Sequence, residues 1–254
     1  SNNFDMYYTR DRFVSQVDPT RDNTSFETRL YPQFHMVNKY PLVKYMQDSQ
    51  ILLEPTVSFS AGTRVDENND SIPNEDSKDL LLGWSNLFSP NRFPGHDRIE
   101  DGIRTTYGLR GSVFKNNGSY GSIFLGQSYR ISDDNIYPNN IGLGEDASDY
   151  VGGIQLGLMN RLILDYNVQM DDEEYNLRRH EVRSTLNLDD FRAQVSYFYD
   201  RSVNGTNLDT AREQIRPAFE WDFYDQWRFG GSALYDLSPD QDGLVRAQGV
   251  LTYF

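Results

Sequence analysis

The chain has 254 residues, of which 37% are hydrophobic, 14% aromatic and 24% charged, and its formal net charge is −14. It contains no run of eighteen or more apolar residues, which excludes a helical membrane span. The acidic balance repels phosphate and no sustained basic stripe is present, which argues against nucleic acid as a partner. The lack of cysteine fits either a reducing compartment or an envelope protein without disulfides.

Apolar and polar residues alternate along most of the chain, which predicts strands and indicates no helix. The pattern and the turn residues between its segments predict about twelve strands. In chain order they cover residues 4–16, 25–41, 51–62, 101–115, 119–131, 149–158, 161–170, 175–188, 191–201, 210–223, 227–237 and 243–254. The mean hydropathy of −0.69 is typical of a soluble protein. A transmembrane barrel shows the same value, because only every second strand residue faces lipid and its loops are polar.

The connections between these strands alternate in length. The short ones are 116–118, 159–160, 189–190 and 224–226, and the longer, mostly acidic ones include 63–100, 132–148 and 202–209. Bacterial barrels have tight turns on the periplasmic side and longer loops outside, so the alternation assigns a direction to each strand. Asn117 and Gly118 predict a hairpin with a type I′ turn. The loop 171–174 is unexpectedly short for the outer side.

The later predicted strands have one apolar and one polar face. The residues expected to project from the convex, lipid-facing side are Leu162, Leu164, Tyr166, Phe191, Val195, Tyr197, Phe219 and Trp221. Aromatic residues between 221 and 229 flank one short turn, as expected for a girdle at the membrane interface. The predicted fold is therefore an all-β, antiparallel transmembrane β-barrel. The alternative is a soluble β-rich binding module that buries Phe219, Trp221 and Phe223 in its core.

Five blocks in a fixed order carry a family resemblance. The longest is 86–110, which runs from a loop punctuated by proline and glycine into a predicted strand, and the others are 72–77, 126–134, 142–150 and 178–182. Together they resemble the outer-membrane barrel of the LptD family of lipopolysaccharide-assembly proteins. The resemblance implies that residues 1–254 are a single barrel domain, truncated at both ends, of a larger barrel with roughly twice as many strands. Two edges, near 4–16 and 243–254, are then expected to stay unpaired with each other.

The same resemblance implies a translocon in the cell outer membrane of a Gram-negative cell, with no covalent chemistry and no cofactor. The implied partners are lipopolysaccharide, membrane lipids, the plug lipoprotein LptE and the periplasmic bridge protein LptA. Such a barrel passes sugars through a hydrophilic lumen. The candidates for the lumen wall are Arg192, Gln194, Arg216 and Glu220. Strand count, closure, gate strands, use of the plug and cation binding by outer loops stay open.

The long loop 63–100 has two readings. It is interpreted as a cap, in which 86–99 covers or lines the mouth of the lumen and is held by charge-assisted hydrogen bonds of Arg92 and Arg98. Residues 86–100 are expected to be ordered and 66–78 disordered. The candidate cap residues are Asn91, Arg92, Phe93, Pro94, Gly95, His96, Asp97 and Arg98. The alternative is a mobile surface loop whose proline and glycine residues block strand pairing.

Other function classes have little support. A passive or substrate-specific porin is the alternative within the membrane class, and it requires a complete, closed barrel. His35, His96 and His180 have no neighbouring nucleophile at a recognisable spacing, which argues against an enzyme. The acidic run 66–70 has the spacing of oxygen ligands, but it lacks the glycine and distal glutamate of a calcium loop. We therefore assign neither a catalytic nor a metal site.

Overall fold

The computed structural model of the chain describes residues 2–10, 24–63, 82–93, 95, 98–132, 137, 141–201, 211–223, 226–238 and 242–253. For 2–10 and 24–28 it describes the backbone alone. Every regular element within these ranges is a strand. In the same part of the chain there is no helix long and apolar enough to cross a membrane.

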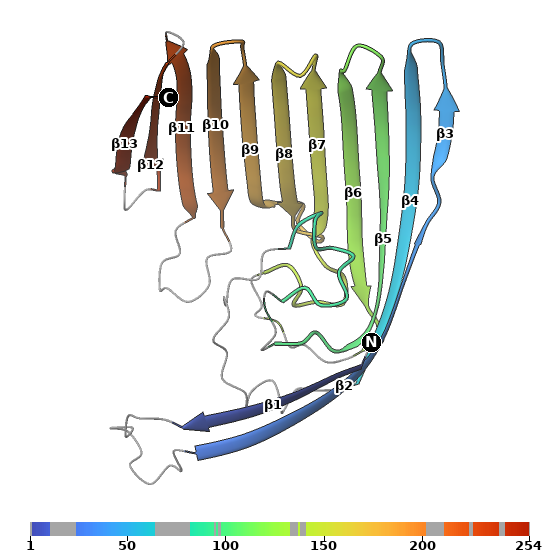
Figure 1. Cartoon of the computed structure of the whole chain (residues 1–254). Helices are drawn as coiled ribbons and strands as arrows, with labels where there is room; N and C mark the ends of the chain where they lie inside the picture. Colours follow the sequence, from blue (N-terminus) through green and yellow to red (C-terminus); the bar gives the residue numbers. More distant parts are fainter. Residues whose placement is uncertain are drawn as a thin grey trace.

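The strands form one antiparallel sheet, which confirms the predicted all-β class (Figure 1). They are β1 Asn2–Arg10, β2 Thr24–Lys39, β3 Leu42–Tyr45, β4 Ser49–Gly62, β5 Gly102–Lys115, β6 Tyr120–Arg130, β7 Tyr150–Leu158, β8 Leu162–Met170, β9 Leu177–Asn187, β10 Phe191–Asp200, β11 Arg212–Phe223, β12 Trp227–Asp236 and β13 Gly243–Tyr253. Apart from β3, sequence neighbours pair along the sheet, and every pair is antiparallel, including those joined by long connections. Each predicted strand bound within the described residues is within two residues of the observed one.

The strand β3 was not predicted. It continues β2 beyond Tyr40 and Pro41 and pairs with the same neighbour, β4. Proline lacks the backbone N–H that the ladder needs, and both Pro41 and the facing Pro55 of β4 interrupt it. At this point Tyr40 N donates to Pro55 O at 3.1 Å. The strand predicted at 25–41 therefore ends at Lys39, and pairing with β4 resumes two residues later in β3.

The tight turns lie together at one end of the sheet and the longer connections at the other (Figure 1). The type I′ turn predicted at Asn117 and Gly118 was wrong, because only Gly118 has a positive φ, 81°. The hairpin is nevertheless present, with Gly118 N donating to Lys115 O. A type I′ turn is found instead between β7 and β8, where Met159 and Asn160 have φ of 48° and 56°.

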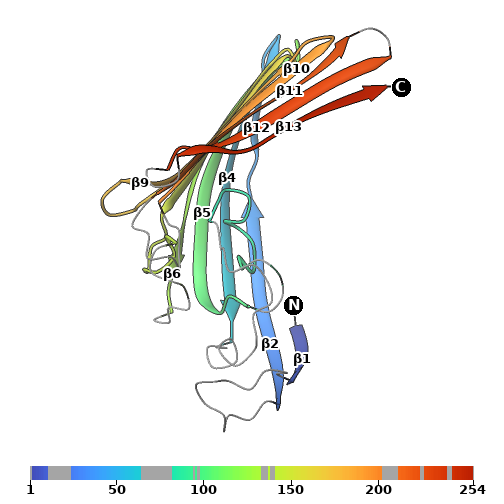
Figure 2. The same cartoon turned by 90° about the vertical axis from the view of Figure 1, so that its left-hand side faces the viewer.

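The sheet curves around one face (Figures 1 and 2). Large apolar side chains are exposed on its outer, convex face. None of the eight residues predicted to project outward is buried. Val195 and Trp221 are 43% and 50% exposed, which rules out the closed apolar core of the alternative soluble module for these residues. An exposed apolar surface that extends over neighbouring strands is typical of a surface meant for another apolar medium.

Aromatic side chains mark both ends of this apolar surface. At the tight-turn end, Trp221 packs on Phe223 with ring centres 5.4 Å apart, as the girdle prediction requires. At the opposite end, His180 packs between Tyr197 and Tyr199, which the sequence did not suggest. Along β10, the distance from Phe191 to Tyr199 is about 26 Å at roughly 3.3 Å per residue. At the 35–45° strand tilt of outer-membrane barrels, this length spans roughly 19–22 Å along the membrane normal, somewhat less than their ~25 Å apolar band.

The sheet is open within the described residues. Its edges are β1 and β13, and these two strands do not pair with each other. The pairing is also interrupted inside the sheet, where Arg216 and Pro217 of β11 have no paired residue in β12. Pro217 again supplies no donor, so the backbone bonds are interrupted at that point.

Candidate functional site

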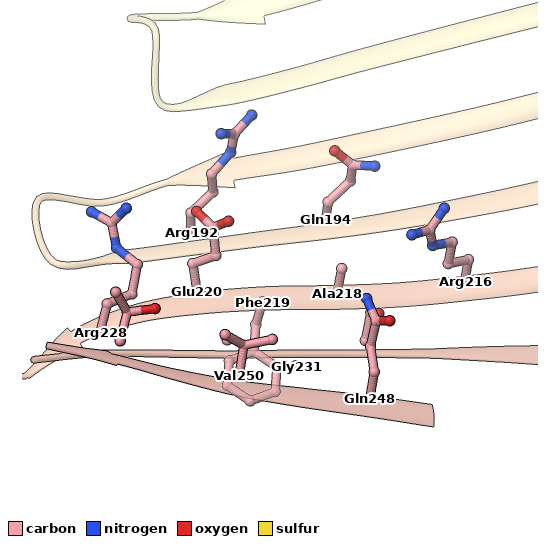
Figure 3. A pocket seen from close by; sticks show the side chains of 13 residues that line it. Arg192, Gln194, Arg216, Ala218, Phe219, Glu220, Arg228, Gly231, Gln248 and Val250 are labelled. Carbon is pink, nitrogen blue, oxygen red and sulfur yellow. The ribbon is translucent and has the colours of Figure 1, made fainter. Parts of the chain in front are cut away.

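The four predicted lumen-wall residues lie on the concave face of the sheet. Arg192 on β10 is opposite Glu220 on β11, and in the same strand pair Gln194 is opposite Ala218. Arg216 is also on this face, opposite Ser196. Figure 3 shows the four predicted side chains projecting to one side of β10 and β11, whereas Phe219 points to the other side. The strand alternation therefore brings all four together.

These residues line a hollow of about 690 Å³. Its centre is formed by the small residues Ala218, Gly230 and Ser232, which are neighbours across β11 and β12. Long polar side chains stand around this centre, and Gln248 and Thr252 of β13 close it on the edge side. The hollow exists because short side chains occupy adjacent register positions between long ones.

A loop segment, residues 82–93, packs on the concave face of β5, β6 and β7 (Figure 1). Its Leu82 and Leu87 are 1% and 0% exposed and belong to a cluster with Phe124 of β6 and Val151 of β7. Residues from the next long loop complete the cluster with Tyr137, Ile141 and Leu143. We call residues 82–93 the packed loop segment; it is ordered by burial of apolar side chains.

Glycines on the sheet make room for this segment. A side chain at Gly126 would meet Leu87 Cδ2 at 2.7 Å and Phe124 at 2.8 Å, and one at Gly108 would meet Phe88 at 3.0 Å. Real Cβ atoms essentially never show the two contacts under 3.0 Å, and a contact at 3.0 Å is tighter than nearly all of theirs. The flat strip along β5 and β6 is therefore a seat for the aromatic and leucine side chains of the loop.

A buried ion network fixes the end of the loop to the sheet. Glu100 accepts from Arg92 Nε at 2.9 Å and forms an ion pair with Arg104 Nη1 at 2.9 Å. The three side chains are at most 4% exposed. Arg104 also donates to Ser89 O at 2.6 Å, and the hydroxyl of Tyr31 on β2 donates to Glu100 O at 2.5 Å. Strands β2 and β5 thus hold the C-terminal part of the loop, from Ser89 to Glu100.

The charges in this network stabilise one another. Burial alone would raise the pKa of Glu100, but Arg92 and Arg104 outweigh it and hold the pKa below its usual value of 4.5. Burial opposes the charged form of Arg92 as well, yet the adjacent Glu100 raises the pKa of Arg92 above its ordinary value. Burial, followed by the nearby Glu100, raises the pKa of Tyr137. These shifts favour the charged forms of Glu100 and Arg92. The pKa of Arg104 is lowered, mainly by burial, although Glu100 opposes that shift.

A second set of contacts ties the following loop to β8 and β9. Arg178 Nε lies 2.7 Å from Asp149 Oδ2, and the same guanidinium also pairs with Asp171. Gln169 Nε2 donates to Asp149 Oδ2 at 2.8 Å and to Ile141 O at 2.9 Å. Burial raises the pKa of Asp149, although Gln169 and Arg178 oppose that shift. Both long loops are consequently anchored on the same concave face.

The structure places five of the eight predicted cap residues. Asn91 organises the loop, with its amide donating to Arg98 O at 2.9 Å and accepting from Glu100 N at 3.1 Å. Arg92 is in the ion network, and Phe93 stacks on Tyr137 with ring centres 5.1 Å apart. Gly95 is exposed with φ of 82°.

The side chain of the fifth, Arg98, makes no charge-assisted bond that the structure shows, and its Nε is buried without a hydrogen-bond partner among the described residues. Pro94, His96 and Asp97 lie outside the described residues, as do the acidic run 66–70 and the stretch 66–78 predicted to be disordered.

The remaining histidines stand apart from each other. His35 Nδ1 is 2.8 Å from Ser60 Oγ on the concave face, whereas His180 lies among tyrosines on the convex face. The described residues contain no group of three or more His, Cys, Asp or Glu side chains arranged to hold a metal ion.

Sequence reasoning missed the central member of the ion network. Glu100 and Arg104 fall where the loop enters β5, and both were included in the 86–110 block without a role. Their four-residue spacing and the parity of Arg104 with the polar face were the available signals. Asp149 and Arg178 were also missed. Their ion pair joins a loop to a strand that is not its neighbour in sequence, so no local pattern indicates it.

Comparison with known proteins gave consistent matches. The family model described as "LptD: LPS transport system D" matches residues 4–227. A protein of Acinetobacter baumannii named LPS-assembly protein LptD is 26% identical over 92% of this chain. Proteins of the same name from Idiomarina loihiensis and Shewanella denitrificans are 26% and 28% identical over 92% and 75% of the chain. The aligned part spans 28%, 31% and 25% of the three relatives.

Proposed function

Because this chain belongs to the LptD family, we propose that it forms part of the wall of an outer-membrane barrel that passes lipopolysaccharide to the cell surface. In this proposal the convex face contacts membrane lipid and the concave face lines the lumen. The observation that carries it is the curved sheet with an apolar outer face and a polar inner face.

The open edges support a larger barrel. Strands β1 and β13 do not pair with each other in the described part of the chain, and the aligned region is 28% of the Acinetobacter baumannii relative. We propose that residues 1–254 form one domain segment whose edges pair with further strands of the full-length protein. A complete porin formed by this chain alone would require pairing between those edges. The partners implied by the family resemblance are the plug lipoprotein LptE and the bridge protein LptA.

The packed loop segment is proposed to cap the lumen on the outer side. It lies at the end of the sheet with the longer connections, opposite the tight turns that bacterial barrels place in the periplasm (Figure 1). Its buried leucines and the Arg92–Glu100–Arg104 network hold it against the wall. The exposed lumen wall at Arg192, Gln194, Arg216 and Glu220 lies outside this covered area and stays available to sugars.

The proposal is tested by photocrosslinking in the full-length protein. A photoreactive benzophenone side chain replaces Gln194, which faces the hollow, or the adjacent Val195, which is 43% exposed on the convex face. In cells that export lipopolysaccharide, we expect lipopolysaccharide adducts from position 194 and phospholipid adducts from position 195. The two variants differ by one residue on one strand and thus form a matched pair. Equal adducts from both positions, or lipopolysaccharide adducts from neither, would reject the assigned faces.

A further inference from the structure

Two arginine side chains in the concave hollow have no partner among the residues that the structure describes. Arg192 and Arg216 both line it and both project from the wall on the same side (Figure 3). Among the described residues neither of them forms an ion pair or a side-chain hydrogen bond, even though Arg192 is directly opposite Glu220 across the strand pair. A guanidinium carries five N–H donors in a planar fork, which suits the oxygens of a phosphate.

The other charges of the hollow are arranged differently. Arg228 is already engaged by Asp222, with Nε to Oδ1 at 2.5 Å and Nη2 to Oδ2 at 2.9 Å. Glu220 is the one carboxylate among the lining residues, and it lies opposite Arg192 and four positions from Arg216 along β11. The chain as a whole carries −14, so a locally cationic hollow stands out against a surface that repels anions.

The shape of the hollow fits an extended ligand. Arg192 and Arg216 are four positions apart in the register of β10 and β11, which corresponds to about 14 Å along the strands at roughly 3.4 Å per residue. Between them, Ala218 and Gly230 let a ligand approach the backbone, and Gln194, Ser232 and Gln248 offer neutral hydrogen-bonding groups. Cationic groups at two points with neutral donors between them match a saccharide that carries more than one phosphate.

We propose that this hollow is a binding subsite for the phosphate groups of a phosphorylated saccharide, with Arg192 and Arg216 each taking one phosphate. The inference rests on the proposed function and deepens it, since it assigns charge recognition to one part of the lumen wall. Arg192 follows the tight β9–β10 turn directly, so the subsite begins at the proposed periplasmic end. The concave face is turned away from lipid, which favours a saccharide over a phospholipid headgroup as the source of the phosphate.

Binding to the purified full-length protein in detergent tests the proposal. The probe is the deacylated, phosphorylated saccharide of lipopolysaccharide, compared with the same saccharide after phosphatase treatment, and phosphatidylglycerol and inorganic phosphate serve as competitors. The variants are Arg192→Gln, Arg216→Gln and the charge-preserving Arg216→Lys. The matched control is Arg183→Gln, an arginine on the same face that is paired with Glu181 at 3.1 Å and is not in the hollow.

We expect each Arg-to-Gln substitution in the hollow to weaken binding of the phosphorylated saccharide by roughly ten- to a hundredfold, the size of a hydrogen bond between charged groups. Arg216→Lys should retain more affinity than Arg216→Gln, Arg183→Gln should match the parent, and higher ionic strength should weaken binding. Equal affinity for the dephosphorylated saccharide would overturn the phosphate assignment. Phosphatidylglycerol or inorganic phosphate competing as well as the phosphorylated saccharide would overturn the saccharide assignment.

The two proposals fail in different ways. If the arginine variants bind like the parent while position 194 still crosslinks to lipopolysaccharide, the phosphate subsite is wrong and the lumen wall stands. If the parent binds neither saccharide and position 194 gives no adduct, both the subsite and the proposed function are wrong.

Discussion

Glu100→Gln should release the packed loop segment without disturbing the sheet. The carboxylate of Glu100 is shared by Arg92 and Arg104, and the three side chains are at most 4% exposed. Glutamine keeps the shape and an acceptor oxygen but removes the charge, which leaves two buried guanidinium groups without a counter-ion. Removal of one partner from a buried ion pair costs about 3–5 kcal/mol. Because each 1.4 kcal/mol is a factor of ten, the open population of the loop should rise by roughly a hundredfold to a few thousandfold.

Amide hydrogen exchange in the folded full-length protein measures this opening. The backbone amides of Leu87 and Ser89 are bonded to Gly83 O and Asn86 O at 3.0 Å, so they report on the loop itself. Their exchange should accelerate, while amides of β8 remain protected. The matched control is Asp222→Asn, which removes an acid from an exposed pair and should leave exchange unchanged. Equal acceleration in both variants, or none in Glu100→Gln, would refute the role given to the network.

The effect should depend on pH in a defined direction. The pKa of Glu100 is lowered in the folded state, so its contribution to loop stability is fully present above about pH 4.5, its unfolded value. The contribution is lost as pH falls further, through the folded pKa. The exchange difference between the parent and Glu100→Gln should therefore be constant near neutral pH and shrink under acidic conditions. A difference that is independent of pH would assign the effect to packing.

Three further predictions concern the two faces and the loop. Val195→Arg should destabilise the barrel in a bilayer by about 2–4 kcal/mol, measured by denaturant titration in liposomes, whereas Gln194→Arg on the concave face should have little effect. Gly108→Val should displace the loop, because a side chain there meets only the rings of Phe124, at 2.9 Å, and Phe88, at 3.0 Å, and antibiotic sensitivity of cells should increase while the barrel stays folded. Deletion of 86–99 should make cells permeable to large antibiotics with the barrel still assembled. Unchanged permeability with normal export would show that the loop has no barrier role. Loss of barrel assembly would give the loop a role in folding instead.

The strands were predictable because they follow a local rule. Alternation placed Val195 and Gln194 on opposite faces, and the register of β10 with β11 confirms those faces. The family resemblance read from the 86–110 block is confirmed by the family model. The error at β3 came from Pro41, which read as the end of a strand although the chain continues along the same neighbour. Local propensity shows where a ladder bond is missing but not whether pairing resumes beyond it.

The loop contacts were not predictable in the same way. Arg92 was expected to make a charge-assisted bond, but its partner Glu100 could not be identified because loops lack a period that fixes which side chains meet. Tyr137 packs on Phe93 from a different loop, and no spacing in the sequence encodes that contact. The lumen-wall residues were easier to predict, because alternate residues of a strand lie on the same face, which puts Arg192 and Arg216 on one side of the sheet.

The contact between the packed loop segment and the sheet excludes water. Leakage past it therefore depends on the fraction of molecules in which the loop is open, and not on the width of a permanent gap. Leu82, Leu87 and Leu143 are exposed by 1%, 0% and 2%. Returning three such side chains to water costs roughly 4.5–9 kcal/mol, which the regained freedom of the opened chain partly offsets. A contact that excludes water in this way excludes small and large solutes alike while the loop is closed. Urea, which solvates apolar surface, should therefore increase leakage through this region at concentrations that leave the strand ladder intact.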